Sequence, residues 1–241
     1  MMTYSSKIPK EIRAVFLDAG GTLFRPYPSV GYHYRAVAAR YGLVATEEDV
    51  EMAFRRVWEK HDAMGALKGH VTEKNERDFW YKIVSEVFRG FGPLSDFEAC
   101  FTELFDLFSR PTVWRFFPET EDVLRALKKK GYTLGLISNW DSRLVNLCEG
   151  FDLDRFMDFY LISAIFGAAK PDPKIFRAAL EKANVKAEES VHVGDSLEDD
   201  VRGAYQAGIR AIWLDRSGRR EKLAGHEREV LTVIRDLREL V

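Results

Sequence analysis

Cysteine is scarce in this chain of 241 residues, which contains only Cys100 and Cys148. The two cysteines have neither CxxC spacing nor a nearby histidine, so we expect two reduced packing residues rather than a disulfide or a metal site. Long apolar runs are also lacking, since no stretch approaches the roughly 18 residues of a membrane-spanning helix. Repeats and low-complexity tracts are absent from the sequence as well. These absences favour a globular protein without a membrane partner.

An excess of positive charge is missing too: 36 Lys and Arg face 38 Asp and Glu, which gives a formal net charge of −2. Such a balance leaves nothing to neutralise a phosphate backbone, so we expect no nucleic acid partner. The first residues, Met-Met-Thr-Tyr-Ser-Ser-Lys, lack the apolar core of a signal peptide. We therefore expect a cytoplasmic location.

Hydrophobic residues are abundant, at 46% of the chain with 17 Phe and 5 Trp, which is typical of a folded domain with a real core. Short apolar runs of strand length alternate with amphipathic helical patterns in the second half of the chain. This alternation predicts an α/β fold with a doubly wound, Rossmann-like parallel sheet. The predicted strands are Ala14–Leu17, Thr133–Ile137, Phe159–Ser163, Ser190–Val193 and Ala211–Leu214. The predicted core helices are Glu119–Lys130, Pro173–Ala183, Asp199–Ala207 and a C-terminal helix, Glu227–Val241.

A long insertion separates the first predicted strand from the second. It contains almost no strand pattern, and apolar residues repeat there at helical spacing. The four predicted helices are Val30–Tyr41, Glu47–Lys60, Glu73–Phe88 and Asp96–Ser109. We expect a helical-bundle cap at residues 25–113, inserted into a core of residues 1–24 and 114–241.

Polar side chains follow the predicted strands at the edge where an open α/β sheet binds its ligands. Asp18 ends the first strand, Ser138 and Asn139 end the second, and Lys170 follows the third. Gly194, Asp195, Asp199 and Asp200 follow the fourth. Any one of these is more often a turn or cap residue than a functional one. Together they suit displacement at phosphorus, because a carboxylate attacks, Ser and Lys bind the oxygens, and Mg²⁺ offsets the negative charge.

The order of these motifs resembles that of the haloacid dehalogenase superfamily, and the resemblance covers the whole predicted core. The matching segments are Asp18-x-x-Gly21-Thr22-Leu23, Ile137-Ser138-Asn139, Lys170-Pro171-Asp172-Pro173 and Gly194-Asp195-Ser196-x-x-x-Asp200. The sequence as a whole is similar to the sub-group of haloacid dehalogenase-like hydrolase domain-containing and phosphoglycolate phosphatase-like proteins. The insertion after the first motif resembles the helical cap of that superfamily.

The resemblance implies a role for each motif residue. Asp18 is expected to be the nucleophile, with Ser138 and Lys170 as phosphate ligands. Asp18, Asp195, Asp200 and the backbone carbonyl of Gly20 are expected to hold Mg²⁺, and the spacing selects Asp200 over Asp199. We further expect Gly21, Thr22 and Asn139 to bind the substrate, a small phosphorylated molecule.

Gly20 departs from the family pattern, in which phosphatases carry a second Asp two places after the nucleophile. That Asp protonates the leaving group, and glycine cannot replace a general acid that contributes about 10²- to 10⁴-fold. Candidates for a substitute are Asp141, Tyr27, His33, His61 and His70.

Three readings of function therefore stay open at the level of the sequence. The first is a phosphatase whose leaving group needs little protonation or receives its proton elsewhere. The second is a haloacid dehalogenase, whose halide leaves without a proton, although the acidic fourth motif is of the metal-binding kind. The third is a non-catalytic descendant that binds a phosphorylated ligand or a protein. We expect a monomer or a homodimer.

Overall fold

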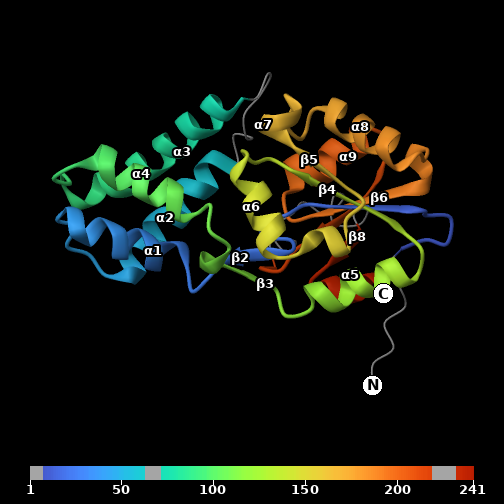
Figure 1. Cartoon of the computed structure of the whole chain (residues 1–241), viewed down its shortest axis with the longest axis horizontal. Coiled ribbons are helices and arrows are strands. Elements are labelled where there is room, and N and C mark those ends of the chain that lie inside the picture. Colours follow the sequence, from blue (N-terminus) through green and yellow to red (C-terminus); the bar gives the residue numbers. More distant parts are fainter. Residues whose placement is uncertain (1–7, 63–71, 219–231) are drawn as a thin grey trace.

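A parallel sheet of six strands lies at the centre of the part of the chain that the structure, a computed structural model, describes: residues 8–62, 72–218 and 232–241. The strand order is β5-β4-β1-β6-β7-β8 (Figure 1). The strands are β1 (Ala14–Leu17), β4 (Thr133–Ser138), β5 (Phe159–Ile162), β6 (Ser190–Gly194), β7 (Arg210–Leu214) and β8 (Thr232–Ile234). The chain runs outward from β1 through β4 to β5 and returns to β6 on the other side of β1. The order thus reverses beside β1, where such folds form a crevice at the carboxyl edge.

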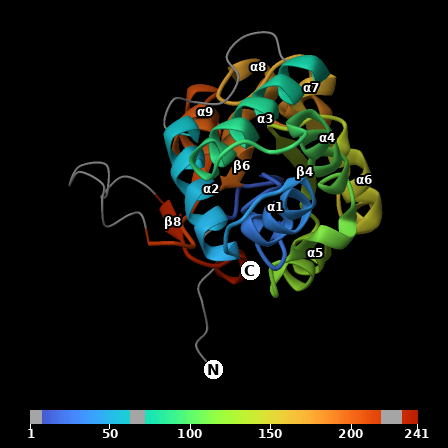
Figure 2. The same ribbon diagram turned by 90° about the vertical axis from the view of Figure 1, so that its left-hand side faces the viewer.

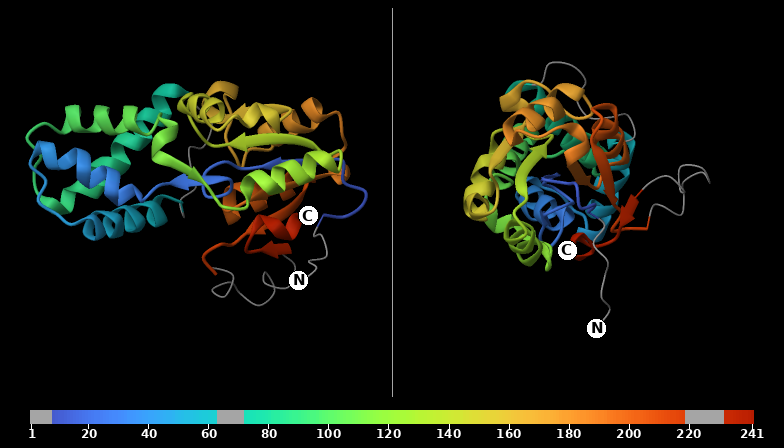
Figure 3. Two further views of the ribbon diagram at one scale, coloured as in Figure 1. Left: turned by 60° about the horizontal axis from the view of Figure 1, so that its bottom comes forward. Right: turned by 90° about the vertical axis from the view of Figure 1, so that its right-hand side faces the viewer.

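Helices cover both faces of this sheet, as the alternation of apolar residues in β1 requires. Val15 and Leu17 join the hydrophobic core under α5 (Thr120–Lys129) and α6 (Arg143–Gly150). Ala14 and Phe16 face the opposite core, under α8 (Pro173–Ala183) and α9 (Gly203–Gln206). Successive strand residues point to opposite faces, so a strand apolar throughout is buried on both sides. The doubly wound α/β fold is confirmed (Figure 3).

Four helices, called the cap below, form a separate hydrophobic cluster in front of the carboxyl edge of the sheet (Figure 2). They are α1 (Val30–Ala38), α2 (Glu47–Asp62), α3 (Glu73–Phe88) and α4 (Phe97–Leu107). Side-chain caps start three of them: Ser29, Thr72 and Asp96 each accept a hydrogen bond from the first helical turn. Among the described residues, no helix has the length and apolar character to cross a membrane.

An antiparallel ribbon links the cap to the sheet, formed by β2 (Phe24–Pro26) and β3 (Trp114–Phe116). Its strands are only three residues long, and sequence reasoning does not predict them. The expected boundaries of the cap at residues 25 and 113 fall at this ribbon and stay a prediction. Cys100 and Cys148 are free and buried, the first in the cap and the second in the core beneath α6.

The predicted C-terminal helix, Glu227–Val241, is wrong over its described part. Residues 232–234 form β8, whose backbone pairs with β7, and a short 3-10 turn follows at Leu237–Leu240. Leu237 and Leu240 are buried, so the apolar spacing is satisfied by a single turn that covers the core. Residues 227–231 lie outside the described part. The helix α6 and the short α7 (Ser163–Phe166) were also not predicted.

Candidate active site

Three side chains from three strand ends meet at the carboxyl edge of the sheet. Asp18 follows β1, and its backbone N–H donates to Val193 O on β6 at 3.0 Å. Lys170 Nζ donates to Asp18 Oδ1 at 2.8 Å, and Ser138 Oγ, at the end of β4, donates to the same oxygen at 3.3 Å. All three side chains are buried. The predicted nucleophile therefore lies in hydrogen-bonding contact with both predicted phosphate ligands.

Lys170 is buried between two carboxylates. Its ammonium also donates to Asp200 Oδ1 at 2.5 Å. Burial alone lowers the pKa of Lys170, but the charges of Asp18 and Asp200 outweigh it, so the pKa is raised above its ordinary value. Burial raises the pKa of Asp18, and the neighbouring Lys170 charge opposes that rise. The lysine therefore stays charged and holds the carboxylate in place.

Asp200 has partners on both carboxylate oxygens. Oδ1 lies 2.8 Å from His192 Nε2 as well as contacting Lys170, and Oδ2 accepts the Ser196 N–H at 3.0 Å. Burial raises the pKa of Asp200, yet the Lys170 charge and the His192 contact bring it well below its usual range. Sequence reasoning missed His192, which is fully buried on β6. The sequence did contain a sign of its role, since His192 is a polar residue in the middle of an apolar strand.

The carboxylates of Asp18, Asp195 and Asp200 are close enough to hold a metal ion together. Each offers an oxygen within 4.8 Å of the others. Gly21 permits this approach, because it has a φ of +79° and a Cβ there would lie 2.7 Å from Asp195 Oδ2. Carboxylate oxygens are hard ligands that suit Mg²⁺. The residues therefore fit a magnesium ion, with the Gly20 carbonyl as a further predicted ligand.

The π-helical turn at Leu197–Arg202 determines which carboxylate of the fourth motif joins the cluster. It directs Asp200 toward Lys170, whereas Asp199 Oδ2 lies 3.4 Å from Asn139 Nδ2. Turns of this kind are frequent at functional sites. The metal cluster accordingly includes Asp200 and not Asp199.

The three predicted substrate-binding residues differ in their surroundings. The Asn139 amide donates to Lys170 O and accepts from Lys170 N, each at 2.8 Å, so it fixes the backbone that carries the lysine. Thr22 is fully buried, and its Oγ1 has no partner among the described atoms. Gly21 and Asn139 line the cavity above Asp18, whereas Thr22 does not. Their binding of substrate stays a prediction.

Arg216 braces the turn that follows the nucleophile. It lies just after β7 and donates to the carbonyls of Gly21 and Thr22 at 3.3 and 3.0 Å. Its guanidinium also pairs with Glu119 at 2.7 Å and lies 3.6 Å from the centre of the Phe117 ring. Sequence reasoning did not identify this residue, because nothing in the sequence around Arg216 places it near Gly21.

The position opposite Gly20 is occupied by an aromatic ring. A Cβ added to Gly20 would lie 3.0 Å from Cζ3 of Trp140, so the indole covers the backbone at this position. The backbone N–H of Trp140 donates to Ser163 Oγ at 2.9 Å, which fixes the residue to the end of β5. The ring also packs 5.1 Å from that of Trp114 in the ribbon.

The residues suggested as substitutes for the missing acid have other hydrogen-bond partners, do not line the cavity, or lie outside the described residues. Asp141 is fully buried and accepts from Arg143 on both oxygens, at 2.8 and 2.7 Å. His33 Nε2 contacts Tyr27 O at 2.9 Å, and neither residue lines the cavity. His70 lies outside the described residues, as does the side chain of His61.

Glu76 is a buried carboxyl group that lines the same cavity from α3. Its Oε1 lies 3.2 Å from Ser163 Oγ, whose other acceptor is Trp140 O at 3.0 Å. Burial, together with the nearby charge of Asp141, raises the pKa of Glu76 to about 7. Sequence reasoning missed this residue because a Glu in the first turn of a helix is usually solvated.

The comparisons with known proteins agree with the fold. A family model described as haloacid dehalogenase-like hydrolase matches residues 12–208. The chain is 32% identical over 210 residues to haloacid dehalogenase-like hydrolase domain-containing protein 3 of Mus musculus, which covers 84% of this chain and 81% of that protein. It is 41% identical over 106 residues to phosphoserine phosphatase of Thermus thermophilus, a match that covers 44% of this chain and 43% of that one.

A solved structure of similar fold is the 2-haloacid dehalogenase of Pseudomonas syringae, with a TM-score of 0.61 and 28% identity. That match covers 95% of this chain and 96% of the other. The relatives thus include proteins named as phosphatases and as dehalogenases. The chain belongs to the haloacid dehalogenase-like hydrolase family.

Proposed function

We propose that this hydrolase is a Mg²⁺-dependent phosphatase that acts on a small phosphomonoester through an aspartyl-phosphate at Asp18. One observation carries the proposal: the Asp18 carboxylate contacts Ser138 and Lys170 and belongs to a three-carboxylate cluster. A halide leaving group needs no such cluster, whereas a phosphate dianion needs its charge neutralised. We keep a cytoplasmic location and a monomeric or homodimeric state as predictions.

The reaction follows from the positions of these side chains. Ser138 Oγ and the Lys170 ammonium donate to the phosphate oxygens and orient the phosphorus toward Asp18. The carboxylate attacks phosphorus, the ester P–O bond breaks, and its electron pair goes to the alcohol oxygen, which takes a proton from water. A second water then attacks the phosphorus, and the bond to Asp18 breaks to restore the carboxylate.

A magnesium ion bound by Asp18, Asp195, Asp200 and the Gly20 carbonyl would neutralise charge on the phosphate. Two further side chains hold the catalytic residues in position. Asn139 holds the backbone of Lys170, and Arg216 holds the turn at Gly21. Since each fixes a contact of Asp18 or of its loop, we assign both as positioning residues.

The test is to measure release of phosphate from an aryl phosphate and of chloride from a 2-chloro acid, with Mg²⁺ and with EDTA. We expect metal-dependent phosphate release, and a loss of roughly 10⁴-fold or more in Asp18→Asn. Chloride release that persists in EDTA would identify a dehalogenase instead. Binding of a phosphate analogue without turnover of either substrate would identify a non-catalytic protein.

A further inference from the structure

The cavity above Asp18 continues from the charged strand ends into the cap. It has a volume of about 320 Å³, and ten of its lining residues are aromatic. Within the cap, the Trp58 ring stacks on the Trp80 ring with centroids 5.7 Å apart and an angle of 11° between the planes. The Phe54 ring continues this stack at 6.1 Å from Trp58. These rings give the cap end of the cavity an apolar aromatic lining that suits an aromatic ligand.

The opposite part of the wall lies beside the nucleophile. Trp140 stands over Gly20, and its ring packs against Trp114 in the ribbon. The Trp140 Nε1 atom is buried and has no hydrogen-bond partner among the described atoms. An acceptor on a bound ligand would satisfy this donor, as buried N–H groups require. The lining of the cavity therefore includes aromatic rings at both ends, and one of them, Trp140, carries an unused donor.

The chemistry of the leaving group also favours an aromatic ligand. An aliphatic alcohol leaves as an alkoxide with a conjugate-acid pKa close to that of water, about 15.7. A phenol has a pKa of about 10, so a phenolate leaves without a proton donor far more readily. The Gly20 position offers no acid, Asp141 is held by Arg143, and Glu76 accepts a hydrogen bond from Ser163 on the cap side of the cavity. A phenol ester is the substrate that this site is equipped to cleave.

We propose that the substrate is the phosphate monoester of a flat aromatic alcohol of the phenol type, whose ring lies between the cap aromatics and Trp140. This inference rests on the proposed phosphatase function. Asp18 attacks the phosphorus, the P–O bond to the ring breaks, and its electron pair leaves with the phenolate oxygen, which takes a proton from water. Water then hydrolyses the acyl-phosphate at Asp18.

Four probes separate the aromatic preference from the basic reaction. Acetyl phosphate has a good leaving group and no ring, ethyl phosphate has neither, benzyl phosphate has a ring on an aliphatic alcohol, and 2-naphthyl phosphate has a ring and a phenolic oxygen. We expect kcat for the naphthyl ester to exceed that for the benzyl ester by about 10²-fold or more. We expect the benzyl ester to have a KM roughly tenfold below that of the ethyl ester.

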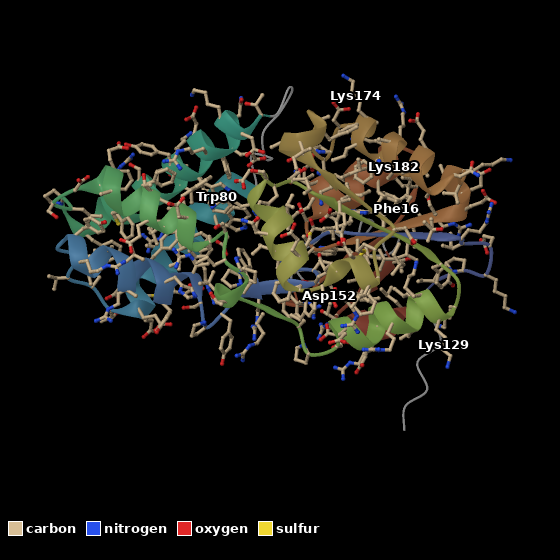
Figure 4. All side chains as sticks on the ribbon, viewed as in Figure 1. Phe16, Trp80, Lys129, Asp152, Lys174 and Lys182 are labelled. Carbon is tan, nitrogen blue, oxygen red and sulfur yellow. The ribbon has the colours of Figure 1, made fainter. Side chains whose placement is uncertain are left out.

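The cap wall is tested with Trp80→Leu, since Figure 4 shows Trp80 among the cap helices. We expect KM for 2-naphthyl phosphate to rise roughly tenfold while kcat/KM for acetyl phosphate is unchanged, which also shows that the variant is folded. Tyr32→Leu is the matched control, because Tyr32 belongs to the same cap, is 45% exposed and does not line the cavity.

The outcomes distinguish the two proposals. Hydrolysis of acetyl phosphate with no preference for naphthyl over ethyl phosphate would overturn the aromatic substrate and leave the phosphatase intact. A Trp80→Leu variant that loses acetyl and naphthyl phosphate activity in equal measure would also count against it, with Trp58→Leu as the second variant of the same wall. Failure to hydrolyse any probe, including acetyl phosphate, would overturn the phosphatase itself.

Discussion

The two ends of the cavity hold a ligand by different means. At the sheet end, Lys170 contacts Asp18 and Asp200 directly through ion pairs. At the cap end, the wall is built from rings such as Trp58 and Trp80, which stack on each other without hydrogen bonds. Under the proposed function, the charged end would bind the phosphate and the aromatic end would select the alcohol. The proposed reaction and its specificity would then be separated in space.

The largest effect is expected at the charged end, in Lys170→Met. Loss of the ammonium removes the positive charge that the buried carboxylates of Asp18 and Asp200 share, so we expect a destabilisation of about 3–5 kcal/mol. Phosphate release should fall by about 10²- to 10³-fold. Chemical denaturation and steady-state kinetics measure the two effects.

The control for this substitution is Lys174→Met, because Lys174 extends outward from α8 in Figure 4. It should leave both the unfolding free energy and the rate unchanged. An unchanged unfolding free energy in Lys170→Met would contradict the burial of charge at this end of the cavity.

A smaller effect is expected where the two ends meet, at Gly20 and Trp140. Gly20→Asp alone is tight, because its Cβ would lie 3.0 Å from the indole. We expect Gly20→Asp combined with Trp140→Phe to raise kcat for ethyl phosphate by about 10²-fold, since the smaller ring makes room for an acid. Trp140→Phe alone is the control and should not raise this rate. An equal rate in the single and double variants would show that protonation of the leaving group is not limiting.

The smallest effect concerns Glu76, the carboxyl group in the aromatic part of the cavity. Its folded pKa of about 7 lies above the unfolded value of 4.5, so its contribution to stability is full below about pH 4.5 and is lost as pH rises to about 7. The groups that face it are Ser163, Asp141, Arg143 and Glu73. The full difference corresponds to about 3 kcal/mol.

We therefore expect Glu76→Gln to raise the free energy of unfolding by about 1–3 kcal/mol at pH 8 and to change it little at pH 4. Urea denaturation at the two pH values measures this difference. Glu48→Gln, at an exposed position of α2, is the control and should be neutral at both. An equal gain at pH 4 would mean that the Glu76 carboxyl does not titrate in this window.

The charged end could be predicted from the sequence because parallel strands bring their carboxyl ends to one edge. Asp18 and Ser138 each end an apolar run, and Lys170 lies in the loop region after the third one, so the fold class places all three near the same edge. The contacts of Arg216 with Gly21 and of His192 with Asp200 do not follow, since they depend on side-chain direction across the sheet. Spacing in a sequence carries no such information.

The aromatic end could not be predicted. Helical periodicity indicates which residues of α2 and α3 are buried, and it predicts Trp80 as a packing residue. Periodicity does not distinguish a ring that faces other helices from one that faces a cavity. The contact between Gly20 and Trp140 could not be predicted for a related reason. The sequence shows that Gly20 lacks a side chain, but it does not show which ring occupies the space. The short strand β8 was not predicted, because its three residues give too weak a strand pattern to outweigh the helical pattern of the segment around them.

The pairing of β1 has a consequence for folding. Ala14 lies beside Thr133 on one side and Ser190 on the other, so this strand has no partner close to it in the chain. Closing such long loops costs entropy before any contact compensates for it, and non-local pairing of this kind slows folding. Asp18 reaches its place only when both distant strands have docked. The position of Asp18 therefore depends on the pairing of three strands that lie far apart in the sequence.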